Sequence, residues 1–265
     1  MQVEVESANA VESLENYQGG WDRAAVHALA VHAADAYEDT PAGGQLIDSR
    51  RTDTQAFLHD YGTHSVLAFR GTETPRMLEL LSMSNPFWRR FRDVLTDLRI
   101  LQDDWVGGGR VHRGFLAAFK SIEFSLEKAL SELPEQSRKN LFICGHSLGG
   151  ALGTLAASRF PCRMVATFGS PRVGNRRFAR SFGLSNAGRY YRVVNRADVV
   201  ARVPVPIRYA HCGIPIFICH DGQFWPRPGL GVRLVAFARN LMRGRSVMIA
   251  DHGMEHYLQA LGSEA

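Results

Sequence analysis

The stretch LFICGHSLGG, residues 141–150, constrains the fold of this chain more than any other segment. An apolar run leads to a serine, Ser147, that has a glycine two residues before it (Gly145) and another two residues after it (Gly149). This spacing is typical of a sharp turn from a strand into a helix, because a side chain at either glycine would clash with nearby backbone. A serine on such a turn stands at a helix N-terminus, where free N–H groups favour a developing oxyanion. The stretch therefore predicts a nucleophilic Ser147; the alternative is an ordinary glycine-rich turn.

The segments around this turn alternate between strand and helix patterns. Strand-like runs occur twice within 54–71, at 141–145, 164–169 and 189–195, and near 207–210 and 214–219, with a turn and short strand in 107–115. Helical periodicity occurs at 21–38, 115–133, 147–159, 175–183 and 252–261. Such alternation predicts an α/β fold with a mainly parallel central sheet and helices on both faces.

The chain of 265 residues is 45% hydrophobic and 22% charged, which is typical of a globular domain with a sizeable core. No linker or repeat divides it, so we expect one domain over 21–265, preceded by a flexible tail over 1–20. The tail is acidic and lacks the apolar segment of a secretory signal, and no apolar run is long enough to span a membrane. The expected location is the cytoplasm by default, with signal-independent export left open.

The net charge of +5 is compatible with an anionic lipid surface or with nucleic acid. No nucleic-acid-binding motif and no zinc-ligand spacing occur, so we expect neither a nucleic-acid partner nor a metal. The four cysteines form no CxxC pair and are expected to be reduced, although pairing of Cys212 with Cys219 is an open alternative. The sequence does not indicate an oligomeric state.

A nucleophilic serine needs a histidine base and an acid that orients it, and on this kind of fold they follow the serine in the order acid, then histidine. Asp198 comes just after the strand at 189–195, which places it at the same sheet edge as Ser147. Asp221 suits a surface turn. Asp251 adjoins His252, and adjacent residues on a helical turn do not face each other. Asp198 is therefore the predicted acid.

His252 begins the last helix and can lean over the sheet edge, so it is the predicted base. His256 lies one turn further along and is the alternative, although a partly buried helix residue is its simpler interpretation. His211 and His220 flank an apolar strand and are expected to cap its ends.

Several of these stretches together resemble the class 3 lipases, a family with the α/β-hydrolase fold. The motifs are VLAFRGT (66–72), DVLTDL (93–98), RVHRGF (110–115), CGHSLGGALGTL (144–155), FGSPRVGN (168–175), YRVVNRADVVARVP (191–204) and DHGMEHYL (251–258). The resemblance implies a catalytic triad of Ser147, Asp198 and His252. His252 also has an aromatic residue, Tyr257, five positions later, as the family's final motif requires.

The same resemblance implies an oxyanion hole formed by the N–H groups of Leu148 and Thr72. Residues Gly71 and Thr72 end a strand, where unpaired N–H groups are available, although they could merely close a hairpin. Arg70 is expected to tie down this loop rather than to take part in catalysis.

The segment 73–92 departs from the family because it is longer than usual there, and Val94 replaces the usual tryptophan of the following motif. It combines clustered arginines with apolar residues suited to lipid, among them Met77, Leu80, Leu81, Phe87 and Trp88. We expect a helical lid that opens on a lipid surface, with a permanently packed helical hairpin as the alternative. The stretch 224–245 has similar chemistry and either extends the same surface or is buried in the core.

The resemblance and the lid together imply a serine hydrolase that cleaves fatty-acid esters of glycerol at lipid–water interfaces, without metal or cofactor. Phospholipase A1 and a small-ester carboxylesterase use the same triad and remain alternatives. A non-catalytic lipase-like module is a further alternative, but such proteins commonly lose a triad member, and this chain has all three.

Overall fold

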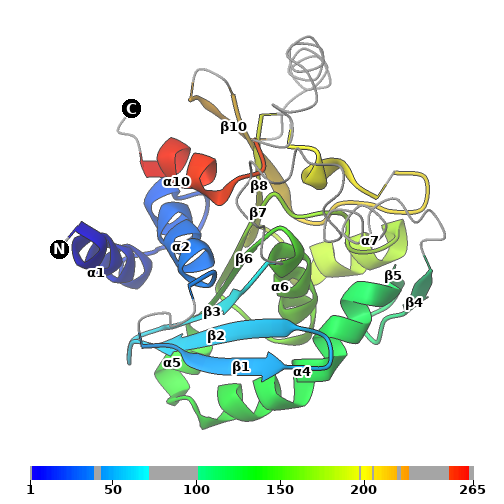
Figure 1. Ribbon diagram of the computed structural model, residues 1–265, viewed down its shortest axis with the longest axis horizontal. Coiled ribbons are helices and arrows are strands. Elements are labelled where there is room, and N and C mark those ends of the chain that lie inside the picture. Colours follow the sequence, from blue (N-terminus) through cyan, green and yellow to red (C-terminus); the bar gives the residue numbers. More distant parts are fainter. Residues whose placement is uncertain are drawn as a thin grey trace.

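The computed structural model describes residues 2–38, 43–71, 101–196, 198–204, 206–219, 222–226 and 251–262. Their main sheet has the strand order β1-β2-β3-β6-β7-β8-β9-β10 (Figure 1). The pairs from β3 to β9 are parallel, whereas β1, β2 and β10 are antiparallel to their neighbours. The strands are β1 (Gln45–Ser49), β2 (Thr54–Asp60), β3 (Ser65–Phe69), β6 (Leu141–His146), β7 (Met164–Phe168), β8 (Tyr190–Asn195), β9 (Ile214–Ile218) and β10 (Phe224–Pro226). This sheet confirms the predicted α/β class.

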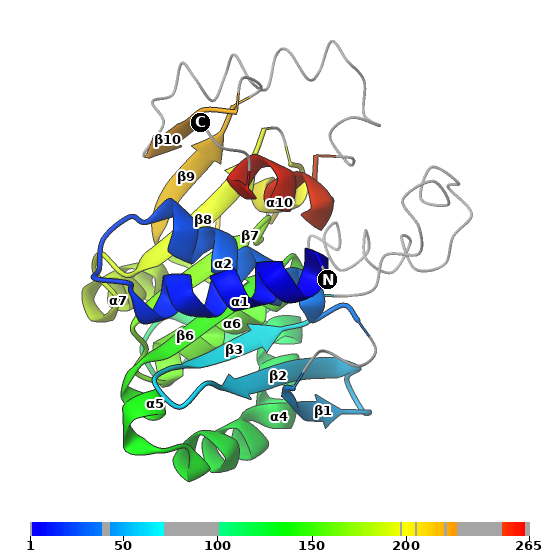
Figure 2. The same ribbon diagram turned by 90° about the vertical axis from the view of Figure 1, so that its left-hand side faces the viewer.

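Helices cover both faces of the sheet (Figures 1 and 2). One face carries α1 (Gln2–Glu15), α2 (Arg23–Asp35) and α10 (Met254–Gly262), and the other carries α4 (Arg113–Glu132), α6 (Leu148–Arg159) and α7 (Arg176–Ser185). The short helix α5 (Glu135–Lys139) connects α4 to β6.

Strand β6 shows how the sequence builds both cores. Its side chains alternate between faces, as the period of two in a strand requires. Leu141 and Ile143 belong to the core under α4 and α6, whereas Phe142 and Cys144 belong to the core under α2. A strand buried on both faces reads as a continuous apolar run, which is the reason that residues 141–144 contain no polar side chain.

The N-terminal segment is not the predicted flexible tail. Residues Gln2–Glu15 form α1, which packs against α2. Ala10, Leu14 and Tyr17 recur at helical spacing and are buried, Leu14 completely. Acidic residues lie between these positions in the sequence, so the composition of the segment did not indicate a buried apolar face.

Three short strands were also not predicted: β1, β10 and β4 (Gln102–Asp104), the last of which forms a separate two-stranded ribbon with β5 (Arg110–His112). The run at 207–210 forms no strand; Ala210 makes only an isolated bridge to Gly174. None of the four cysteines, which all lie in the described ranges, forms a disulfide, so Cys212 and Cys219 are not bridged. Within the described ranges, every helix is too short or too polar to cross a bilayer.

Candidate active site

Ser147 occupies a sharp turn between β6 and α6. Its backbone has φ 56° and ψ −125°, a conformation that residues with a side chain adopt only under strain. A Cβ at Gly145 would lie 2.4 Å from the carbonyl oxygen of Gly149, and one at Gly149 would lie 2.2 Å from that of Phe69. The glycines are therefore required by the close packing of the turn, as the sequence predicted.

The structure brings Asp198 and His252 together, although 54 positions separate them. Asp198 Oδ2 and His252 Nδ1 are 2.9 Å apart, and the two side chains are almost completely buried. Because a carboxylate can only accept, Nδ1 carries the proton and Nε2 is left as a base. Asp198 follows β8 and Ser147 follows β6, so both lie beyond the carboxyl ends of parallel strands. In the described residues no hydrogen bond joins Ser147 Oγ to the imidazole, which is common in the absence of substrate.

Gly169, just after β7, makes room for this pair. Its φ is +59°, and a Cβ there would lie 2.5 Å from Asp198 Oδ2 and 2.8 Å from His252 Nδ1. The backbone of the preceding residue, Phe168, accepts a hydrogen bond of 2.9 Å from the N–H of Ser147. The turn after β7 thus contacts both the serine backbone and the acid–base pair.

The carboxylate of Asp198 accepts hydrogen bonds from several other donors. Tyr257 Oη donates to Oδ2 over 2.6 Å, and the N–H groups of Val200 and Ala201 donate to Oδ1 over 2.8 Å and 3.4 Å. Burial and the Asp198 charge raise the pKa of Tyr257 well above its usual range, so the phenol keeps its proton and acts as a donor. Sequence reasoning used Tyr257 only as a motif residue and missed this contact.

A second residue whose role was not predicted from the sequence is His146, which contacts both the backbone and the ring of His252. His146 Nε2 lies 2.7 Å from the carbonyl oxygen of His252, Nδ1 lies 2.8 Å from Tyr37 Oη, and the two imidazole centroids are 4.4 Å apart. Burial and the neighbouring His252 lower the pKa of His146 to about 3, so the ring is neutral. Its Nε2–H donates to the carbonyl and its Nδ1 accepts from Tyr37. The position of His146 beside Ser147 was the only sequence signal for this role.

Of the two predicted oxyanion-hole residues, only Leu148 lies within the described ranges. Leu148 is the first residue of α6, where N–H groups have no partner within the helix. Thr72 and the predicted lid residues Met77, Leu80, Leu81, Phe87 and Trp88 lie outside the described residues, as does the stretch 224–245 from residue 227 onward. Arg70 bonds Gln55 through its own N–H over 3.1 Å and through Nη1 over 2.9 Å, which agrees with the structural role expected for it.

The other acids and histidines that were considered for the Ser147 site make different contacts. The carboxylate of Asp251 lies 3.7 Å from Arg196 Nη1, and its carbonyl oxygen accepts from Asn195. His256 is about one-third exposed and lies 3.9 Å from Glu255. Asp221 and His220 are outside the described residues. No group of three or more potential metal ligands occurs among the residues that the structure describes.

Comparison with known proteins identifies a family whose sequence model this chain matches. The model of the family "Lipase (class 3)" matches residues 66–207. A secreted mono- and diacylglycerol lipase 1 of Fusarium solani is 40% identical over 114 residues, 41% of this chain. The chloroplastic phospholipase A(1) DAD1 of Arabidopsis thaliana is 33% identical over 153 residues, 52% of this chain. Each alignment spans only 33% of the relative's own length.

Among solved structures, a lipase from Rhizopus microsporus var. chinensis is 26% identical to this chain. It superposes over 76% of each chain with a TM-score of 0.55. Since it covers about three quarters of the chain, the likeness extends well beyond the strand-to-helix turn around Ser147.

Proposed function

This chain belongs to the class 3 lipase family, and on that premise we propose that it hydrolyses fatty-acid esters through an acyl-enzyme on Ser147. The observation that carries the proposal is the buried Asp198–His252 hydrogen bond at the sheet edge from which Ser147 projects. This arrangement gives the serine an imidazole base that is held in place with Nδ1 toward Asp198, as acyl transfer needs.

The proposed reaction has two steps. His252 Nε2 takes the Ser147 hydroxyl proton while Oγ attacks the ester carbonyl, and the N–H groups of Leu148 and Thr72 stabilise the oxyanion. The carbon–oxygen bond to the alcohol then breaks, and the alcohol leaves with the proton from His252. Water attacks the acyl-enzyme in the same way, releasing the fatty acid and restoring the serine. The two steps together consume one water molecule and need no oxidant or reductant.

We further propose a lipid surface as the place of action and glycerol esters as the substrate class. The mono- and diacylglycerol lipase among the relatives supports the substrate class, and the apolar and basic segment 73–92 supports the surface. The test is hydrolysis of tributyrin as its concentration passes the solubility limit, with Ser147→Ala as the control. A sharp rise at the limit that Ser147→Ala lacks is expected. Smooth saturation below the limit would indicate an esterase for soluble esters, and equal rates in both proteins would refute the nucleophile.

Phospholipase A1 activity is the second candidate, because one relative carries that name. The two activities are separated by offering dioleoylglycerol and dioleoyl phosphatidylcholine in the same mixed micelles. Faster release of fatty acid from the diacylglycerol supports the lipase proposal. Faster formation of lysophospholipid that carries its remaining acyl chain at the sn-2 position would favour phospholipase A1 instead.

A further inference from the structure

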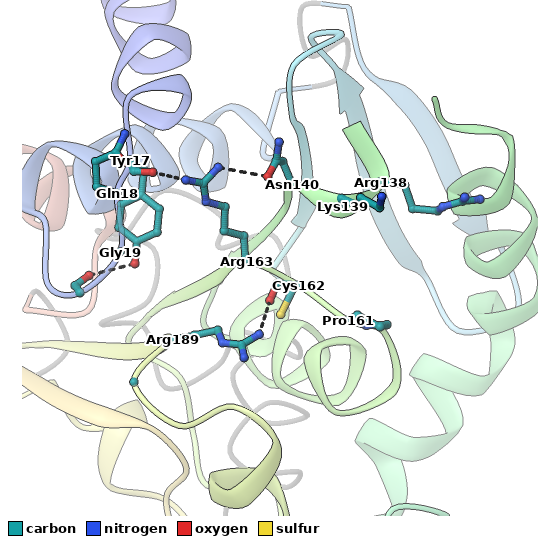
Figure 3. A pocket seen from close by; sticks show the side chains of 12 residues that line it. Tyr17, Gln18, Gly19, Arg138, Lys139, Asn140, Pro161, Cys162, Arg163 and Arg189 are labelled. Carbon is teal, nitrogen blue, oxygen red and sulfur yellow. Dashed lines mark hydrogen bonds between the residues drawn. The ribbon is translucent and has the colours of Figure 1, made fainter. Parts of the chain in front are cut away.

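A pocket of about 710 Å³ opens at the amino-terminal edge of the sheet (Figure 3). Its walls are the loop after α1 and the segments that lead into β6, β7 and β8, namely residues 17–20, 138–140, 161–163 and 188–189. Ser147 lies at the other end of β6, a six-residue strand whose length is about 20 Å. The pocket is therefore separate from the candidate ester site.

Every charged side chain that lines the pocket is a cation: Arg138, Lys139, Arg163 and Arg189. Lys139 makes an ion pair of 2.5 Å with Glu135, and both members of this pair are mostly exposed. In the described part of the chain no carboxylate pairs with any of the three arginines. The positive charge of the pocket is thus largely uncompensated.

The two central arginines are held in place by uncharged groups. Arg163 donates through Nη1 to Asn140 Oδ1 over 3.1 Å and through Nη2 to the carbonyl oxygen of Tyr17, and it stacks on the Tyr17 ring. Arg189 donates through Nη1 to the carbonyl oxygen of Cys162 over 3.4 Å. Figure 3 shows both guanidinium groups within the pocket. Each has five N–H donors, so donors remain for a ligand, and their orientation is already restricted.

We propose that this pocket binds the phosphate group of an organic phosphate monoester. Arginine forks match phosphate oxygens, and a phosphomonoester carries nearly two negative charges at neutral pH. A carboxylate carries one charge and would neutralise less of a site with four cations. The volume of the pocket falls within the range of small-molecule sites, so the organic part of the ligand also has room.

The test measures binding of glycerol 3-phosphate by isothermal titration calorimetry in the full chain carrying Ser147→Ala, so that ester turnover plays no part. The pocket variant combines Lys139→Gln with Arg189→Gln. The control variant combines Lys128→Gln with Arg177→Gln, which removes the same charge elsewhere. Lys128 is a close match for Lys139, because it also forms an exposed ion pair with a glutamate four residues away. We expect the Kd to rise about tenfold or more in the pocket variant and to stay unchanged in the control.

A second assay separates the two sources of such a phosphate. Phosphatidylcholine vesicles, with and without phosphatidic acid, are sedimented with each protein. In one outcome, glycerol 3-phosphate binds weakly, and sedimentation that depends on phosphatidic acid is lost only in the pocket variant. This outcome supports phosphate binding by the pocket, with a lipid headgroup as the source of the phosphate. Equal behaviour of pocket and control variants in both assays, or binding in neither, overturns the proposal. Neither readout depends on ester hydrolysis, so the result is independent of the function proposed above.

Discussion

Tyr257 Oη lies 2.6 Å from Asp198 Oδ2, the same carboxylate oxygen that lies 2.9 Å from Nδ1 of His252. One oxygen thus accepts from both a phenol and the imidazole. The phenol shares the negative charge that would otherwise act on His252 alone. Under the proposed function, Tyr257 is therefore a positioning residue, which acts on His252 through Asp198.

Replacing this phenol should lower the rate of ester hydrolysis. In Tyr257→Phe the loss of a hydrogen bond to a charged group, about 1.5–3 kcal/mol, should lower kcat about ten- to a hundredfold. A soluble short-chain ester provides the assay. The matched control is Tyr191→Phe, whose hydroxyl donates to the carbonyl of Gly188 at the opposite sheet edge. An unchanged kcat in Tyr257→Phe would contradict the assignment.

Gly169→Ala should abolish activity through a steric clash with the acid–base pair. The added Cβ would lie 2.5 Å from Asp198 Oδ2, so the carboxylate must shift, and we expect kcat to fall at least about a hundredfold, since small misplacements in an active site are this costly. Gly62→Ala is the control, because Gly62 also has a positive φ, of +78°, but a Cβ there meets nothing within 4 Å. Thermal unfolding and ester hydrolysis are measured for both. Equal activity in the two variants would contradict the expected clash between the added Cβ and the Asp198–His252 pair.

Leu14→Ala should destabilise the whole protein if α1 is part of the core. The side chain is completely buried in the core that α1 shares with α2, and such truncations cost about 2–5 kcal/mol. Glu15→Ala, at an exposed position of the same helix, is the control and should have little effect. Urea denaturation gives both free energies of unfolding. A flexible tail would instead leave the stability of both variants equal to that of the wild type.

Acid should destabilise the protein through its buried histidines. Burial lowers the pKa of His32 to about 3, with His59 and His64 adding repulsion, and burial likewise lowers that of His146 to about 3. The unfolded chain binds these protons near pH 6.5 and the folded chain does not. The stability that these neutral rings contribute is therefore complete above pH 6.5 and is lost as the pH falls toward 3, at up to about 1.4 kcal/mol per pH unit for each ring.

Urea denaturation between pH 4.5 and 7.5 measures this slope, and His32→Leu isolates one of the two rings. The variant should lose stability less steeply with falling pH than the wild type, whatever its stability at pH 7.5. Parallel curves for the two proteins would mean that His32 is protonated in the folded state.

The sequence by itself determined the turn around Ser147 and the elements next to it, because these depend on local signals. An apolar run of strand length, two glycines at fixed spacing and an alanine-rich helix act within about 20 residues, and the structure has β6, the strained Ser147 and α6 where they were predicted. The strand before Asp198 and the helix after His252 follow from similar patterns. Chain order and sheet topology then selected Asp198 and His252 among the available acids and histidines.

Only the tertiary structure decided which side chains support this site. The contacts of Tyr257 with Asp198, of His146 with His252 and of Tyr37 with His146 join residues 59, 106 and 109 positions apart. No local pattern encodes such contacts, because they arise where loops from separate strands meet. The same reason applies to α1, because its apolar face is buried only when α1 packs against α2. It also applies to the cationic pocket, which is formed by four segments that are distant in the sequence. Hydrophobic periodicity determines the elements, whereas the packing of those elements determines which polar groups meet.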